Sequence, residues 1–246
     1  MPYFDTFDGS SLYYDDQGDG RPLVLLHGFA ADTNLNFVRT GIFDALLDAG
    51  YRVIALDSRG HGLSAKPTDP AAYANDAMRL DVQALLDHLA LDECIAVGYS
   101  MGGHTALRLA PHEPRLTALA LLGIGETIGQ IDGGPHTRDY LVKLLETDDP
   151  ETIEHSSLRE FRLMAGLDRE PLVAFMKAPW VDTRARLDEV SVPVVIIVGE
   201  KDQNAVDPSN LAAQLNATLE RVPGDHFTAN ARPELHQALL EFLAKQ

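Results

Sequence analysis

Cysteine, positive charge and long apolar runs are all scarce in this chain. Its 246 residues include one cysteine, Cys94, which excludes an internal disulfide and leads us to expect a reducing, cytoplasmic compartment. The longest apolar runs, near residues 119–122 and 194–198, have the length of a strand and are too short to cross a membrane. The first residues contain neither a basic segment nor a long apolar stretch, so no signal peptide is expected.

Acidic residues outnumber basic ones, with 37 Asp and Glu against 20 Lys and Arg, and the formal net charge is −17. Nucleic acids and anionic lipid surfaces are also negatively charged, so this balance argues against binding to either. Apolar residues make up 45% of the chain and charged residues 23%, which is an ordinary globular composition. A chain of this length can bury one substantial core and is small for two full domains.

Short apolar, β-branched runs alternate with helical patterns along most of the chain. This alternation predicts an α/β fold with a mostly parallel sheet covered by helices. A hairpin that turns at Asp8-Gly9 is expected to open the chain. The expected strands cover residues 3–7, 12–16, 23–26, 53–56, 95–97, 119–122, 194–198 and 219–222. The expected helices cover residues 37–49, 75–89, 101–110, 208–215 and 233–244.

The alternation stops between residues 125 and 182, where amphipathic helical patterns replace β-rich runs. We expect residues 125–182 to form a helical cap inserted into a core made of residues 1–124 and 183–246. Such an insertion would cover the carboxyl edge of the sheet; an additional helical layer is the alternative. The candidate substrate-binding side chains of the cap, which are equally suited to packing between cap and core, are Phe161, Met164, Phe175, Met176 and Trp180.

The sequence Gly98-Tyr99-Ser100-Met101-Gly102 lies where an expected strand gives way to an expected helix. A Gly-x-Ser-x-Gly motif at such a turn is typical of a nucleophile elbow. The turn is so tight that the serine backbone is strained and only glycine fits on either side. Ser100 is therefore the candidate nucleophile, and the amide of Met101, at the start of the helix, is a candidate donor to an oxyanion.

A serine hydroxyl is a weak nucleophile that needs a base to take its proton and an acid to orient that base. His226 follows the last expected strand, and Asp202 follows the strand before it. Both positions are carboxyl ends of strands, where α/β sheets place their ligands. Glu126, after residues 119–122, is an alternative acid, whereas Asp225 is expected to point away from its neighbour His226.

An oxyanion hole needs a second amide, which the segment His27-Gly28-Phe29 can provide. The Phe29 N–H is the candidate donor, because Gly28 allows the backbone to approach the site closely. The His27 ring is expected to brace the loop rather than to touch substrate. In the loop of residues 57–64, Arg59 is expected to pair with Asp57 and to stiffen the loop. The histidines outside these motifs show no metal-ligand spacing, and we predict no metal site.

Together these motifs resemble the α/β-hydrolase superfamily over essentially the whole chain. The matching segments are His-Gly-Phe at 27–29, Asp-x-Arg-Gly-His-Gly-x-Ser at 57–64, Gly-Tyr-Ser-Met-Gly-Gly at 98–103, Gly-x-x-Asp at 199–202 and Gly-Asp-His at 224–226. The order Ser, Asp, His is the triad order of that family. The resemblance implies an eight-stranded sheet with an antiparallel second strand, a cap after the sixth strand and no cofactor.

Within the superfamily, the chain resembles small capped carboxylesterases, enol-lactone hydrolases and C–C bond hydrolases. Ser100 departs from the branches with aspartate or cysteine at this position, and Phe29 departs from the tryptophan frequent in haloperoxidase-like members. The resemblance implies a serine hydrolase that cleaves small, largely apolar esters through an acyl-enzyme. The alternatives are a small-molecule sensor and a lactonase or C–C bond hydrolase in which Arg159 or Arg162 holds a substrate carboxylate. The oligomeric state is left open.

Overall fold

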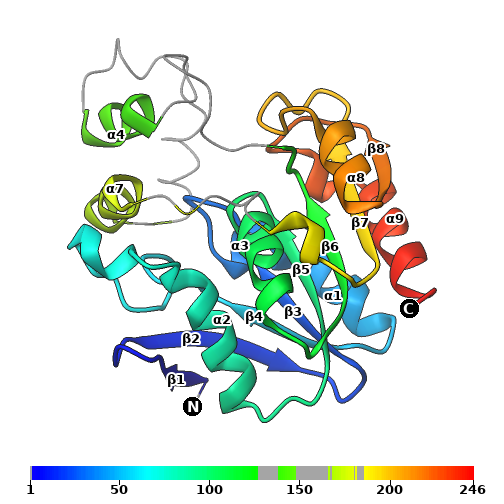
Figure 1. Ribbon diagram of the computed structural model, residues 1–246, viewed down its shortest axis with the longest axis horizontal. Helices are drawn as coiled ribbons and strands as arrows, with labels where there is room; N and C mark the ends of the chain where they lie inside the picture. Colours follow the sequence, from blue (N-terminus) through cyan, green and yellow to red (C-terminus); the bar gives the residue numbers. More distant parts are fainter. Residues whose placement is uncertain (1, 127–137, 148–165, 167, 180, 182–185) are drawn as a thin grey trace.

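The computed structural model describes residues 2–126, 138–147, 166, 168–179, 181 and 186–246. Eight strands form one sheet in the order β1-β2-β4-β3-β5-β6-β7-β8 (Figure 1). Strand β2 is antiparallel to β1 and β4, and the remaining pairs are parallel, which confirms the predicted α/β architecture. The strands are β1 Tyr3–Asp5, β2 Ser11–Gln17, β3 Pro22–Leu26, β4 Arg52–Leu56, β5 Cys94–Tyr99, β6 Leu116–Leu122, β7 Val194–Gly199 and β8 Thr218–Val222.

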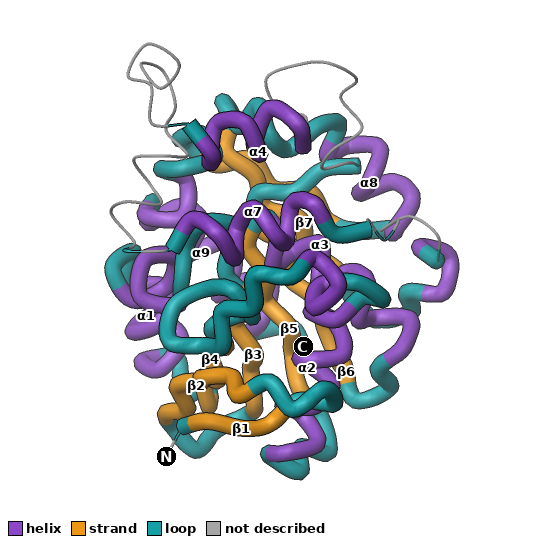
Figure 2. The backbone as a smooth tube through the Cα atoms, turned by 90° about the vertical axis from the view of Figure 1, so that its left-hand side faces the viewer, coloured by secondary structure: helices purple, strands orange, loops and turns teal. Residues whose placement is uncertain are grey.

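Helices cover both faces of the sheet, because side chains of a strand point alternately to opposite sides. Val24 and Leu26 of β3 pack into a cluster with α2, α3 and α8, whereas Leu23 and Leu25 pack into a cluster with α1 and α9. Figure 2 shows α1 and α9 on one side of the strands and α2 and α8 on the other. The helices are α1 Ile42–Asp48, α2 Ala77–His88, α3 Met101–Leu109, α4 Arg138–Glu146, α7 Arg169–Lys177, α8 Pro208–Leu215 and α9 Pro233–Leu243.

The expected helix over residues 37–49 is divided into two elements. A short π-helical turn, η1 Asn34–Val38, is followed by α1 from Ile42. Gly41 between them has φ +84°, a left-handed conformation that interrupts a right-handed helix and that glycine adopts without a steric cost. The division matters for the site, because it orients the residues of η1 independently of α1.

Helices α4 and α7 lie between β6 and β7 in the chain and pack side by side (Figure 1). Leu145 of α4 and Leu172 of α7 are buried together with Ala30, which follows β3. The Arg138 guanidinium donates to the carbonyls of Met176 and Ala178 and so caps the end of α7. The pair occupies the region predicted to be a cap, but most of residues 125–182 lie outside the described residues, so the boundaries of that cap stay a prediction.

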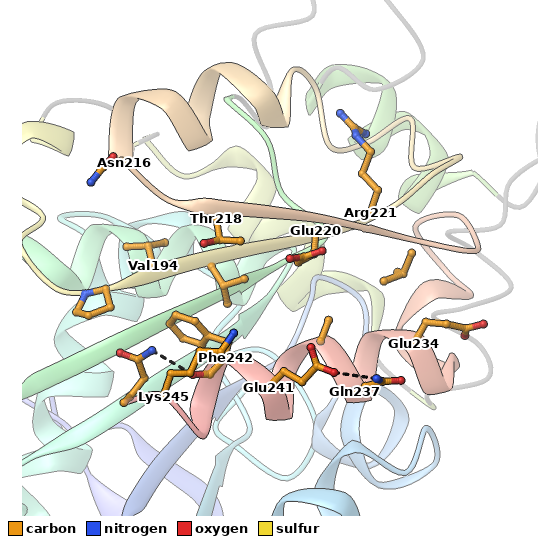
Figure 3. Close-up of a pocket in the computed structure, with 15 residues that line it drawn as sticks. Val194, Asn216, Thr218, Glu220, Arg221, Glu234, Gln237, Glu241, Phe242 and Lys245 are labelled. Carbon is orange, nitrogen blue, oxygen red and sulfur yellow. Dashed lines mark hydrogen bonds between the residues drawn. The ribbon is translucent and has the colours of Figure 1, made fainter.

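At the far edge of the sheet, a groove runs between β8 and α9 (Figure 3). Glu220 and Arg221 of β8 line it, together with Glu234 and Glu241 of α9, and Gln237 donates to Glu241. None of the predicted site residues lines this groove. Among the helices of the described segments, none combines the length and apolar character that a membrane span requires.

Candidate active site

The turn at Ser100 has the strained geometry of a nucleophile elbow. Ser100 has φ +52° and ψ −114°, outside the regions that L residues prefer. Its amide donates to the Leu122 carbonyl at 2.8 Å, which ties the turn to β6. A Cβ at Gly98 would lie 2.3 Å from the Gly102 carbonyl oxygen, and one at Gly102 would lie 2.0 Å from that of Leu26. Larger residues therefore do not fit at either glycine, as the motif predicts.

A continuous hydrogen-bonded path connects Ser100, His226 and Asp202. The His226 Nε2 lies 2.9 Å from the Ser100 Oγ, and Nδ1 lies 3.0 and 2.9 Å from the two Asp202 carboxylate oxygens. A carboxylate only accepts, so Nδ1 carries the proton, and the Nε2 lone pair is left to accept from the serine hydroxyl. The Asp202 Oδ1 also accepts from the amides of Asn204 and Ala205, which fixes the carboxylate.

The loop that carries His226 is held by the residue preceding the nucleophile. The Tyr99 hydroxyl donates to the His226 carbonyl at 2.8 Å. Burial raises the pKa of this phenol, so it stays a neutral donor. The Tyr99 ring lies against Gly123, which has φ +63° and where a Cβ would be 3.2 Å from the ring. Nucleophile and base are thus positioned by adjacent residues of one chain segment.

The other two acids near the site do not contact the His226 ring. Asp225 accepts from the Phe227 and Thr228 amides in a tight turn, and the Thr228 hydroxyl that donates to it is the main cause of its lowered pKa. Its carboxylate therefore points away from the site, as expected from its adjacency to His226. The backbone amide of Glu126 donates to the Val206 carbonyl at 2.7 Å, and it is Asp202 that is bonded to the imidazole.

The loop after β3 brings further amides to Ser100. A Cβ at Gly28 would lie 3.3 Å from the Ser100 Cβ, so the backbone here is in close contact with the nucleophile. The Gly28 amide donates to the Asn36 Oδ1 at 2.6 Å, and the Ala30 amide donates to the His61 Nε2 at 3.3 Å. Within the described part of the chain, the amides of Phe29 and Met101 donate no hydrogen bond. These are the two amides predicted to face an oxyanion.

His27 braces this loop, as predicted. Its Nδ1 donates to the Gly28 carbonyl at 2.8 Å, and its Nε2 accepts from the Ser58 amide at 3.0 Å. Each contact determines the role of its nitrogen, because a carbonyl only accepts and an amide N–H only donates. The imidazole therefore links the loop after β3 to the loop after β4 and is fully buried between them.

The prediction that Arg59 pairs with Asp57 is wrong. The Arg59 guanidinium makes a bidentate pair with Asp81 of α2, with both contacts at 2.6 Å, and a further contact of 2.9 Å with Asp8. The Asp57 carboxylate instead accepts from the amides of Thr33 and Leu63, each at 2.9 Å. Arg59 is completely buried and pairs with the equally buried Asp81, because the Asp57 carboxylate, which is also buried, already accepts from two amides.

Two of the five predicted substrate-binding residues can be placed. The Phe175 ring of α7 stacks on the Phe29 ring, with centroids 5.6 Å apart and planes at 29°. Met176 is buried against Ala30 and Leu172. Both therefore pack between α7 and the loop after β3, which is the alternative role considered for them. The residues that lie outside the described ones are Phe161, Met164 and Trp180, and also Arg159 and Arg162.

Asn36 and His61 are the site residues that the sequence motifs miss. His61 belongs to the quoted motif at 57–64, but the motif gives it no role. Asn36 belongs to no motif and lies just before the helix expected over residues 37–49. A buried amide side chain in an otherwise apolar stretch, Leu35-Asn36-Phe37, is the one local signal that distinguishes it.

Comparisons with known proteins identify the fold family. Residues 21–149, about half of the chain, match the family model described as alpha/beta hydrolase fold. The chain is 28% identical to 3-oxoadipate enol-lactonase 2 of Acinetobacter baylyi, over 100% of this chain and 99% of that protein. A hydrolase from Pseudomonas aeruginosa superposes with a TM-score of 0.79 at 27% identity, covering 98% of this chain and 97% of that one. An esterase from Exiguobacterium antarcticum gives 0.82 at 24% identity, covering 98% of each chain, and supports the fold alone. The chain belongs to the α/β-hydrolase fold family.

Proposed function

We propose that the protein is a serine hydrolase that cleaves small, largely apolar carboxylic esters through an acyl-enzyme. The observation that carries the proposal is the path from the Asp202 carboxylate through His226 to the Ser100 hydroxyl, with contacts of 2.9 to 3.0 Å. This arrangement gives a weak nucleophile its base, and gives the base a fixed tautomer. Membership in the α/β-hydrolase fold family supports the same reading.

In the proposed acylation step, the Ser100 Oγ attacks the ester carbonyl carbon while the His226 Nε2 takes the hydroxyl proton. The carbonyl oxygen becomes an anion, which accepts from the amides of Phe29 and Met101. His226 then passes its proton to the leaving alcohol, and the carbon–oxygen bond of the ester breaks. Each donor of such an oxyanion hole is worth about 3–4 kcal/mol of transition-state stabilisation in a comparable hydrolase.

In the proposed deacylation step, His226 takes a proton from water as the water oxygen attacks the acyl carbon. The bond to the Ser100 Oγ breaks, the proton returns to that oxygen and the carboxylic acid leaves. Asp202 stabilises the imidazolium in both steps and stays ionised. The buried carboxylate is suited to this role, because two backbone amides and the imidazole Nδ1–H all donate to it.

A lactone is the second candidate substrate class. The full-length similarity to a protein named 3-oxoadipate enol-lactonase favours it. The chemistry is unchanged, because a lactone is an ester whose acid and alcohol belong to one molecule. A panel of nitrophenyl esters of increasing chain length, beside simple lactones, distinguishes the two classes by their kcat/KM values.

The variant Ser100→Ala tests the proposed mechanism. We expect kcat to fall by about 10⁴-fold or more with the fold retained, as for removal of the nucleophile in other serine hydrolases. A fluorophosphonate probe should phosphonylate the Ser100 Oγ with loss of fluoride in the wild type, and should label no residue in the variant. Ser209→Ala, at an exposed position of α8, is the matched control and should keep wild-type turnover. Near-wild-type turnover in Ser100→Ala would exclude the mechanism.

A further inference from the structure

The amides on either side of Phe29 are engaged by side chains from two other parts of the molecule. Asn36 of η1 accepts from the Gly28 amide, and His61 of the loop after β4 accepts from the Ala30 amide. The Phe29 amide between them donates to no group among the described residues. Peptide planes are rigid, so holding the Gly28 and Ala30 amides limits the orientations that the Phe29 amide between them can adopt.

The Asn36 side chain is an acceptor in this contact. The group opposite it is an N–H at 2.6 Å, so the amide oxygen, and not the nitrogen, faces Gly28. Asn36 is 2% exposed, and its backbone carbonyl in turn accepts from the Asn230 side chain at 3.3 Å. The Asn36 Oδ1 is therefore buried, and water does not replace the Gly28 amide as its hydrogen-bond partner.

The His61 ring is also held as an acceptor. Its Nδ1 lies 3.0 Å from the Arg59 carbonyl and must donate to it, which leaves the lone pair of Nε2 to receive the Ala30 amide. Burial lowers the pKa of His61 to about 3, so the ring stays neutral at ordinary pH and keeps that lone pair. Ala30 itself has φ +54°, a left-handed conformation that a residue with a side chain adopts only where its surroundings impose it.

We propose that Asn36 and His61 are positioning residues of the oxyanion hole, which hold the loop so that the Phe29 N–H points at the substrate carbonyl oxygen. The inference rests on the proposed hydrolase function of Ser100. Neither residue needs to touch substrate. Their effect is confined to a donor that binds the transition state more strongly than the ground state, so their loss lowers kcat and leaves KM nearly unchanged.

The test compares substitutions of Asn36 and His61 that remove the hydrogen-bond acceptor with substitutions that retain one. Asn36→Leu and His61→Leu should each lower kcat by about 10- to 100-fold with KM changed less than about threefold, the loss typical of a poorly aimed oxyanion donor. Asn36→Asp and His61→Gln retain an acceptor oxygen and should recover most of that loss. Leu35→Ala, which disturbs the same turn η1 without removing an acceptor, should lower the melting temperature and leave kcat near the wild-type value.

A second readout separates a positioning role from a merely structural one. The inhibition constant of a trifluoromethyl ketone, which forms a tetrahedral oxyanion on serine, should rise in proportion to the loss of kcat/KM across the four variants. The dissociation constant of an intact ester, measured in the Ser100→Ala background, should not change on adding Asn36→Leu. Wild-type kcat and unchanged ketone inhibition in folded Asn36→Leu and His61→Leu would overturn the inference. If Ser100→Ala itself kept its turnover, the proposed function would fail instead.

Discussion

The two sides of the candidate active site are held in place by different means. On the nucleophile side, main-chain contacts dominate: the Ser100 amide bonds to β6, and Gly102 lies directly against the Leu26 carbonyl. On the oxyanion side, the loop after β3 depends on side chains 8 and 31 positions away, those of Asn36 and His61. Substitutions on the nucleophile side should therefore create steric clashes and lower the stability of the fold. Substitutions on the oxyanion side should remove hydrogen bonds and lower activity while the fold is retained.

The largest expected effect is on the acid that orients the base. Asp202→Asn should lower kcat by about 10⁴-fold, because the amide can donate to Nδ1 and so favours the tautomer with the proton on Nε2. Steady-state kinetics with a nitrophenyl ester measures this loss. Glu126→Gln is the matched control, since Glu126 was the alternative acid, and it should keep activity within about twofold. A large loss of kcat in Glu126→Gln with little loss in Asp202→Asn would instead show that Glu126 is the acid that orients His226.

The next effect tests the buried support of the loop that carries His61. Arg59→Met should lower the free energy of unfolding by about 3–5 kcal/mol, because it leaves the Asp81 carboxylate buried without its partner. Urea denaturation followed by circular dichroism gives the value. Arg52→Met removes a partly exposed pair with Asp16 and should cost about 1 kcal/mol or less. Equal losses of unfolding free energy in the two variants would show that the buried Arg59–Asp81 pair stabilises the fold no more than the partly exposed Arg52–Asp16 pair.

Steric failure of the elbow should be smaller but clear. Gly102→Ala should lower the free energy of unfolding by about 1–3 kcal/mol, because its Cβ would lie 2.0 Å from a main-chain oxygen of β3 and the helix must shift. Gly103→Ala is the matched neighbour. Its Cβ would meet the Ile124 side chain at 2.8 Å, which can turn aside, so a smaller loss is expected. A larger loss at Gly103 than at Gly102 would contradict the main-chain explanation.

The smallest effect concerns the contact between α7 and the oxyanion loop. Phe175→Ala removes the ring stacked on Phe29, and such pairs contribute about 0.5–1.5 kcal/mol beyond their buried area. We expect the melting temperature to fall by a few degrees with kcat changed less than about threefold, because Asn36 and His61 still hold the amide. Phe175→Leu should lie between the wild type and Phe175→Ala. A loss of kcat as large as in Asn36→Leu, at unchanged KM, would assign the positioning role to α7.

The same contrast explains what could be predicted from the sequence. The buried β-branched runs and the elbow glycines act over a few consecutive residues, so the strands and the Ser100 turn were predictable. The meeting of Ser100 with Asp202 and His226 followed from the rule that parallel strands share a carboxyl edge. The predicted partner of Arg59, Asp57, was wrong, because the long Arg59 side chain reaches Asp81 of α2 and not the nearby acid in its own loop.

Asn36 could not be assigned for a related physical reason. Its role depends on Gly41, whose left-handed backbone ends one helical turn and begins another, and on the distance between η1 and the loop after β3. Neither is a property of the residues next to it in the chain. The boundaries of the cap and the lining of the pocket depend on side chains from separated segments, and remain predictions.

The exposed residues of β8 bear on how copies of this protein meet in concentrated solution. The strand ends the sheet, so its outer amides and carbonyls are open to pairing with a strand of another molecule. Glu220 and Arg221 are both exposed there, and at the opposite end β1 is only three residues long. The charged side chains on edge strand β8 and the short length of edge strand β1 disfavour edge-to-edge pairing between molecules. Both features therefore protect the sheet from aggregation.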